Sequence, residues 1–208
     1  MPGSSPQKLA AVFLAAVCAA FAAAARADDA PPAVFGGHGV TFSYPLTWQH
    51  IDAQFTIQFG KPLWSEFFAP PAPAPPQPTD PAAQPPAAPG VLYDVVAITA
   101  FRLPVAITKK TVARYKSAIQ AGVAQLAARG GGSLTSPASR VVVGGLPGYR
   151  FELTMQADET TMLQSRIVVV FKKKTEYFFN CQSVKDGPLA ADVSGGCDQV
   201  TRSFRAGR

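Results

Sequence analysis

Residues 141–182, VVVGGLPGYRFELTMQADETTMLQSRIVVVFKKKTEYFFNCQ, decide the fold of this chain. Apolar and polar residues alternate through 149–156 and 176–182, and 163–171 is rich in β-branched residues, which is typical of strands. Short turn sequences at 144–148, 157–160 and 172–174 separate these runs. The spacing predicts consecutive antiparallel hairpins.

Further strands are predicted on the N-terminal side of this stretch. Residues 40–44 and 54–59 alternate, as half-buried strands do. Residues 91–101 are almost continuously apolar, as expected for a central strand covered on both faces.

Two helices complete the predicted fold. Residues 108–128 carry one apolar stripe and end at the glycines 130–132. Residues 189–204 form a second stripe, which Gly195 and Gly196 weaken, so we expect a short or broken helix there. The pattern predicts an α+β fold, an α/β/α sandwich in which an antiparallel sheet of about six strands carries the long helix and the C-terminal helix.

Residues 1–27 resemble a secretory signal peptide. Lys8 precedes an apolar run, and Ala25-Arg26-Ala27 supplies small residues for cleavage. The run is mostly alanine, which favours cleavage over a membrane anchor. The other alternative is a lipoprotein cleaved before Cys18. Such a cleavage site requires a small residue before the cysteine, and Val17 occupies that position. We expect an exported protein, periplasmic or secreted, with one domain over 28–208.

Residues 69–90 hold ten of the 20 prolines in the chain. Proline lacks a backbone N–H, so this Pro/Ala-rich stretch is predicted to be a flexible loop inserted in the domain. A docking ligand for an aromatic groove is the alternative, but the stretch contains no basic residue to orient such a partner.

The net charge of +6 falls to +4 when the leader takes away Lys8 and Arg26. This mild excess does not indicate nucleic-acid binding, which needs a clustered basic face. The only dense run of charge, Lys172, Lys173 and Lys174, falls at a predicted turn, where solvated lysines are ordinary. An anionic membrane or an acidic partner is the alternative, with membrane contact at most peripheral.

Cys181 and Cys197 are the only cysteines of the mature chain. Cys181 shares a strand face with Phe179, and Cys197 shares the apolar stripe of the last helix, so both should point into the space between helix and sheet. Because a pair of cysteines in an oxidising, extracytoplasmic compartment usually forms a disulfide, we predict a structural disulfide between them. A redox-active pair would usually be a Cys-x-x-Cys.

Motifs for catalysis are not found in the sequence. The chain has only two histidines, His38 and His50, and no metal-ligand spacing, nucleophile elbow or phosphate loop. A weak site with Asp52 or Asp94 is conceivable, but exposed loop histidines are commoner. We therefore expect no catalytic residue, no metal and no cofactor.

Three aromatic residues, Trp64, Phe67 and Phe68, precede the proline-rich stretch. They are either the end of the core or an exposed contact for a partner. Burial is the more frequent outcome for large apolar residues, so the core interpretation is favoured.

Three phrases resemble PsbP-like domains. They are Gly39-Val40-Thr41-Phe42-Ser43-Tyr44-Pro45-Leu46-Thr47-Trp48, Gly145-Leu146-Pro147-Gly148-Tyr149, and Val200-Thr201-Arg202-Ser203-Phe204-Arg205. The resemblance covers most of 38–60 and 91–205 and excludes the proline-rich stretch. It implies an antiparallel sheet between helices and a role in binding rather than catalysis.

We therefore expect an exported, monomeric, non-catalytic module for binding or for cell-envelope assembly and stabilisation. Its partner would be an envelope protein or a membrane complex. Two alternatives stay open: a hydrolase that uses His38 or His50, and a carrier of a small apolar ligand held between helix and sheet.

Overall fold

The computed structural model describes residues 31–51, 61–71 and 93–207. The chain divides into two units, 1–31 and 32–208, and every element below belongs to the second. The predicted signal peptide, the predicted strand at 54–59 and nearly all of the proline-rich loop lie outside the described residues. Ala69, at the start of the predicted loop, still belongs to a strand.

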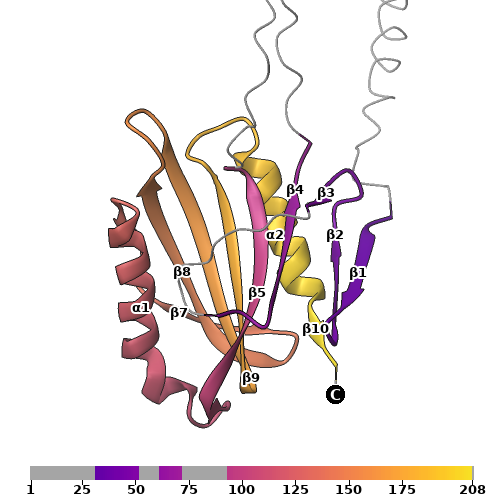
Figure 1. Cartoon of the computed structure of the whole chain (residues 1–208), viewed down its shortest axis with the longest axis vertical. Helices are drawn as coiled ribbons and strands as arrows, with labels where there is room; N and C mark the ends of the chain where they lie inside the picture. Colours follow the sequence, from indigo (N-terminus) through magenta and orange to yellow (C-terminus); the bar gives the residue numbers. More distant parts are fainter. Residues whose placement is uncertain (1–30, 52–60, 72–92, 208) are drawn as a thin grey trace, which may run out of the picture. The chain divides into compact units, whose positions relative to one another are not determined.

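The larger of two sheets is antiparallel and seven-stranded, in the order β3-β4-β5-β9-β8-β6, with β7 also beside β8 (Figure 1). Its strands are β3 (Gln49–Ile51), β4 (Trp64–Ala69), β5 (Val95–Ile107), β6 (Ser133–Leu134), β7 (Ser139–Val143), β8 (Leu146–Gln156) and β9 (Met162–Val184). The predicted α+β class and antiparallel sheet are confirmed.

The long strand β9 folds back on itself at the three lysines. Its first arm pairs with β8 and its second arm with β5. The Lys185 N–H donates to the Met162 carbonyl (2.8 Å), whereas 23 residues in one straight strand would place these ends roughly 70 Å apart. Lys173 has a φ of 55°, as a tight turn requires. The predicted hairpin with its turn at 172–174 is therefore confirmed.

A second, three-stranded sheet has the order β1-β2-β10. Its strands are β1 (Ala33–Gly37), β2 (Val40–Tyr44) and β10 (Arg205–Ala206). The predicted strand at 40–44 thus exists, but it lies outside the large sheet. Phe42 packs against Phe204 and Phe68, so this small sheet closes the core beside α2.

The helices cover opposite faces of the large sheet. A 3₁₀ turn, η2 (Val112–Tyr115), leads into α1 (Lys116–Arg129), and α2 (Ala190–Ser203) lies on the other face. The predicted long helix is thus a 3₁₀ turn followed by an α-helix, with Gly130 as its C-cap.

The predicted C-terminal helix is present, but the expected break is wrong, because α2 is continuous through Gly195 and Gly196. A Cβ atom at Gly196 would lie 2.2 Å from the ring of Trp48, so the helix uses this glycine to approach the tryptophan closely. Trp48 is buried, and its backbone N–H donates to the Pro45 carbonyl (3.0 Å). The Tyr-Pro-x-x-Trp phrase therefore has a packing role.

Candidate functional site

A large apolar cleft lies between α1 and the adjoining face of the large sheet. Its volume is about 910 Å³. Apolar side chains from both layers line most of it; among them are Val95, Ala97, Phe101, Leu103, Tyr115, Ile119, Val123, Leu126 and Phe178. A cleft of this size and lining is typical of small-molecule sites.

The cleft exists because α1 covers only part of the sheet. The helix packs on β6 and β8, where Val123 and Ala127 join the core cluster of Phe151 and Ile167. Figure 1 shows α1 beside β8 and away from β4. The face of β5 and of the second arm of β9 therefore lines the cleft.

Strand alternation determines which side chains reach the cleft. Val96, Ile98 and Ala100 of β5 belong to the core cluster under α2. Their neighbours Val95, Ala97 and Thr99 point the other way and line the cleft.

The second arm of β9 gives the cleft a polar floor. Glu176, Asn180 and Gln182 share its cleft-facing side with Phe178. Burial raises the pKa of Glu176 from its ordinary value to about 7. The Asn180 Oδ1 atom is buried and has no hydrogen-bond partner within the described part of the chain.

Cations stand at the two ends of the cleft. Lys61 and Arg102 lie at the end near the β9 turn, since Arg102 is the register partner of Thr175. Arg129, the last residue of α1, lies at the opposite end with Gly130 and Met155.

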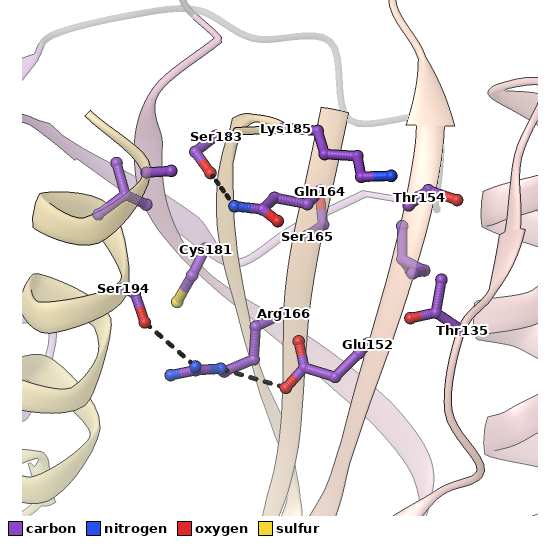
Figure 2. A pocket seen from close by; sticks show the side chains of 13 residues that line it. Thr135, Glu152, Thr154, Gln164, Ser165, Arg166, Cys181, Ser183, Lys185 and Ser194 are labelled. Atoms are coloured by element: carbon purple, nitrogen blue, oxygen red, sulfur yellow. Dashed lines mark hydrogen bonds and ion pairs between the residues drawn. The ribbon is translucent and has the colours of Figure 1, made fainter. Parts of the chain in front are cut away.

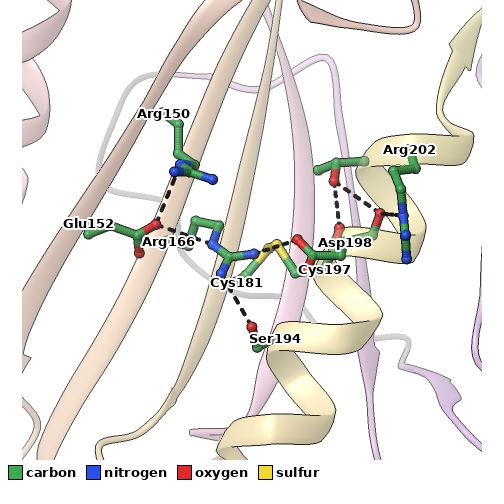
Figure 3. Close-up of a disulfide and its surroundings, with 9 residues drawn as sticks. Arg150, Glu152, Arg166, Cys181, Ser194, Cys197, Asp198 and Arg202 are labelled. Atoms are coloured by element: carbon green, nitrogen blue, oxygen red, sulfur yellow. Dashed lines mark hydrogen bonds and ion pairs between the residues drawn. A yellow bond between two sulfur atoms is a disulfide. The ribbon is translucent and has the colours of Figure 1, made fainter. Parts of the chain in front are cut away.

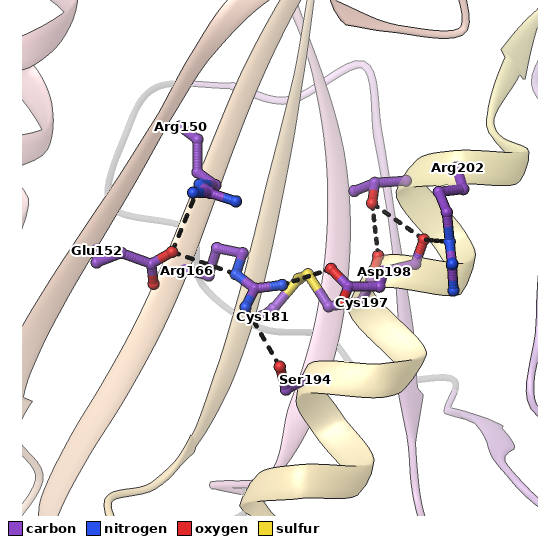
Figure 4. A network of polar contacts seen from close by, with 9 residues as sticks. Arg150, Glu152, Arg166, Cys181, Ser194, Cys197, Asp198 and Arg202 are labelled. Atoms are coloured by element: carbon purple, nitrogen blue, oxygen red, sulfur yellow. Dashed lines mark hydrogen bonds and ion pairs between the residues drawn. A yellow bond between two sulfur atoms is a disulfide. The ribbon is translucent and has the colours of Figure 1, made fainter. Parts of the chain in front are cut away.

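A smaller, more polar hollow of about 380 Å³ lies on the α2 side of the sheet (Figure 2). Arg166 dominates it. Its guanidinium contacts Glu152 (3.3 Å) and Asp198 (2.7 Å) and donates to Ser194 Oγ (3.2 Å), as Figure 4 shows. Its donors are thus engaged in connecting β8, β9 and α2, so Arg166 has a structural role.

The predicted disulfide joins Cys181 of β9 to Cys197 of α2, beside Arg166 (Figure 3). Both cysteines are buried in the core cluster under α2. The bond therefore attaches the last helix to the sheet, as the periodicity predicted.

The two histidines meet on one carboxylate to which no sequence motif points. His38 Nε2 lies 2.8 Å from Glu66 Oε1, and His50 Nε2 lies 2.5 Å from Glu66 Oε2. His38 stacks on Trp64 and His50 on Phe68. This cluster connects the small sheet to β4.

The alternative carboxylate partners do not join the histidine cluster. Asp94 instead accepts the Val184 N–H (3.1 Å), and Asp52 lies outside the described residues. No group of three or more His, Cys, Asp or Glu side chains within residues 31–51, 61–71 and 93–207 is arranged to hold a metal ion.

The aromatic residues before the proline-rich stretch are mainly core. Phe68 is fully buried and Phe67 nearly so, while Trp64 is half-buried against His38. Phe68 belongs to the core cluster under α2, whereas Phe67 lines the cleft on the other face of the sheet.

The lysines of the β9 turn differ from one another. Lys173 and Lys174 are exposed, whereas Lys172 is half-buried and its ammonium contacts the Gly207 carbonyl. Only the first two are therefore fully available to a partner. In the portions of the chain that are described, no helix has both the length and the hydrophobicity to span a bilayer.

No sequence motif marks the residues of the cleft. One feature of the sequence could have indicated the cleft. In the second arm of β9, a strand in the middle of the sheet, the polar residues Glu176, Asn180 and Gln182 share one face. Polar residues at such positions indicate either solvent or a ligand over that face.

Comparison with known proteins supports the fold. No family profile and no curated protein matches the sequence. The chain is similar in structure to cyanobacterial PsbP (CyanoP) from Synechocystis sp. PCC 6803, with 14% identity and a TM-score of 0.52, over 84% of this chain and 91% of CyanoP. The predicted PsbP-like fold is therefore confirmed.

Two other solved structures are similar at lower TM-scores. One is a protein from Bacteroides thetaiotaomicron (15% identity, TM-score 0.48, 82% of this chain and 46% of that one), so this chain spans about half of its length. The other is LpqN, involved in cell envelope biogenesis of Mycobacterium tuberculosis (11% identity, TM-score 0.47, 85% of this chain and 86% of LpqN).

Proposed function

We propose that this protein is an exported, non-catalytic binding module that holds a small apolar ligand in the cleft between α1 and the sheet. The observation that carries the proposal is the cleft itself. Its volume of about 910 Å³ and its mostly apolar lining, with a few polar groups on the floor, match the usual composition of ligand sites.

The disulfide supports the extracytoplasmic part of the proposal. A buried Cys181–Cys197 bond is typical of proteins that fold in an oxidising compartment. Together with the predicted signal peptide, it favours a periplasmic or secreted protein.

The two histidines lie outside the proposed ligand site. Each Nε2 atom is engaged with Glu66, and the cluster lies on the face of β4 opposite the cleft. Docking to an envelope protein or membrane complex stays a prediction from the PsbP-like resemblance, which crosslinking in the envelope would test.

Filling the cleft tests the proposed function. Gly122 lines the cleft from α1 and is exposed, and a Cβ atom added to it would meet no atom of another segment within 4 Å. We expect Gly122→Trp to place its indole in the cleft without disturbing the helix. Titration with N-phenyl-1-naphthylamine, an uncharged apolar dye, should show saturable fluorescence with the wild type and at least tenfold weaker binding with the variant.

Gly122→Ala is the matched control, because it changes the helix residue without filling the cleft. Alanine should stabilise α1 by up to about 1 kcal/mol and leave dye binding unchanged. Absence of saturable binding to the wild type, or equal binding by the Trp and Ala variants, would contradict the proposed function.

A further inference from the structure

We infer that the ligand is an anionic amphiphile, with its alkyl chain against the apolar lining and its acidic head at the end of the cleft that holds Lys61 and Arg102. This inference rests on the proposed function, and it adds the charge of the ligand and its orientation.

The strand register brings the two cations to the same end. Trp64 of β4 is the partner of Ala100 of β5, and the Leu63 N–H donates to the Ala100 carbonyl (2.8 Å). Continued in the antiparallel direction, this register places Lys61 beside the segment of β5 that holds Arg102. Both residues line the cleft, and no ion pair engages either of them within the described residues.

The surroundings of this end add further positive charge. Lys173 is the register partner of Ile107, so the exposed lysines of the β9 turn lie beside the end of β5. Lys109 and Lys110 lie two and three residues after the end of β5 and are exposed. An anionic head at this end of the cleft would therefore meet cations from three segments of the chain.

The sequence between β5 and β8 has an extreme charge bias. The stretch 95–151 contains no Asp or Glu, and its eight basic residues are Arg102, Lys109, Lys110, Arg114, Lys116, Arg129, Arg140 and Arg150. This stretch supplies η2 and α1, the whole helical wall of the cleft. Arg102 and Arg129 of this stretch line the cleft, and no residue of the stretch offers an anion a competing carboxylate.

Acidic residues gather at the opposite end of the sheet. Asp158 and Glu159 lie in the β8–β9 loop, and Asp186 lies in the loop after β9. Figure 1 shows both loops at the far end of the sheet from the β9 turn. Arg129 lies near this acidic end. The residue after it, Gly130, accepts a hydrogen bond at its carbonyl from the backbone N–H of Gln156 (2.8 Å), the last residue of β8 before the acidic loop. An anionic head is therefore favoured at Lys61 and Arg102.

Glu176 is the only carboxylate among the described residues that line the cleft. Its pKa of about 7 leaves the group largely neutral in mildly acidic medium and partly neutral at pH 7. Its opposition to an anionic head is thereby reduced.

Paired ligands of equal chain length test the inference. Laurate and dodecanol would each displace N-phenyl-1-naphthylamine at pH 7, from the wild type and from Lys61→Glu/Arg102→Glu. We expect the ratio of laurate affinity to dodecanol affinity to fall at least tenfold in the double variant. In the wild type, the ratio should also fall as NaCl is raised from 20 mM to 500 mM, roughly the range over which salt screens such attraction.

The matched control is Arg140→Glu/Lys185→Glu, which makes the same change of net charge at exposed residues that do not line the cleft. Its laurate-to-dodecanol ratio should equal that of the wild type. Lys61→Gln/Arg102→Gln provides a milder pair of substitutions, and it should lower the ratio less than charge reversal does.

The outcomes separate the inference from the proposed function. If dye and dodecanol bind but the ratio is unchanged in both cleft variants, the anionic head is refuted and the apolar site survives. An equal fall in the control variant would also overturn the inference, since the effect would then come from net charge. If neither dye nor dodecanol binds the wild type, the proposed function itself fails.

Discussion

Glu176 places a carboxyl group on the floor of an otherwise apolar cleft, where burial raises its pKa from 4.5 to about 7. In the unfolded chain this group ionises near its ordinary pKa. The folded state therefore binds the proton more tightly, and its stability falls as pH rises from about 4.5 to about 7. Above that range the full cost of the buried charge is present.

Replacing Glu176 with Gln should remove this cost. At pH 8 we expect the variant to be more stable than the wild type by about 1–3 kcal/mol, and near pH 4.5 the two should be equal. Urea unfolding at the two pH values measures the difference. A stability difference that is the same at both pH values would show that the carboxyl group is not desolvated.

Individual residues also show the limits of sequence reasoning. His38 and His50 stand out in the sequence because they are the only histidines, but their shared partner Glu66 does not. Glu66 meets them only because β3 pairs with β4 and the β1–β2 turn lies next to both. Such a contact depends on tertiary structure, and a period-2 pattern does not encode it.

Among the elements, α2 depends most on a single covalent contact. The Cys181–Cys197 bond closes a separation of 16 residues between the sheet and this helix. Because the bond limits the freedom of the unfolded chain, Cys181→Ala/Cys197→Ala should lower the free energy of unfolding by about 3 kcal/mol. Urea denaturation measures the loss.

Dye binding supplies the control for the disulfide variant. The bond lies under α2, on the opposite face of the sheet from the cleft, so the folded variant should bind N-phenyl-1-naphthylamine as the wild type does. Wild-type protein treated with a reducing agent should lose similar stability. Unchanged stability in both samples would mean that α2 is held by its packing alone.

Periodicity predicts the elements better than their pairing. The hairpins of β8 and β9 and the stripes of α1 and α2 follow from local patterns, and all are present. The alternation at 40–44 indicates a half-buried strand, but this pattern does not indicate which sheet a strand joins. The continuity of α2 at Gly196 depends on Trp48, which is distant in the sequence.

At the scale of the whole domain, the helical cover of the sheet and the charged side chains are both distributed unevenly. Helix α1 covers only part of its side of the sheet, which leaves the cleft, and the described acidic and basic loops lie at opposite ends. The excess of basic over acidic residues can be seen in the sequence at 95–151. Which of these residues lie at the cleft can be determined only from the register of β4, β5 and β9.

The central claim is that the protein carries a small apolar molecule in this cleft. Native mass spectrometry of protein freshly purified from the envelope of its own host, without detergent, tests it most directly. We predict a discrete added mass on the wild type and on Gly122→Ala, which is absent from Gly122→Trp. A wild-type spectrum with only the bare polypeptide mass, or an adduct that Gly122→Trp retains, would contradict the claim.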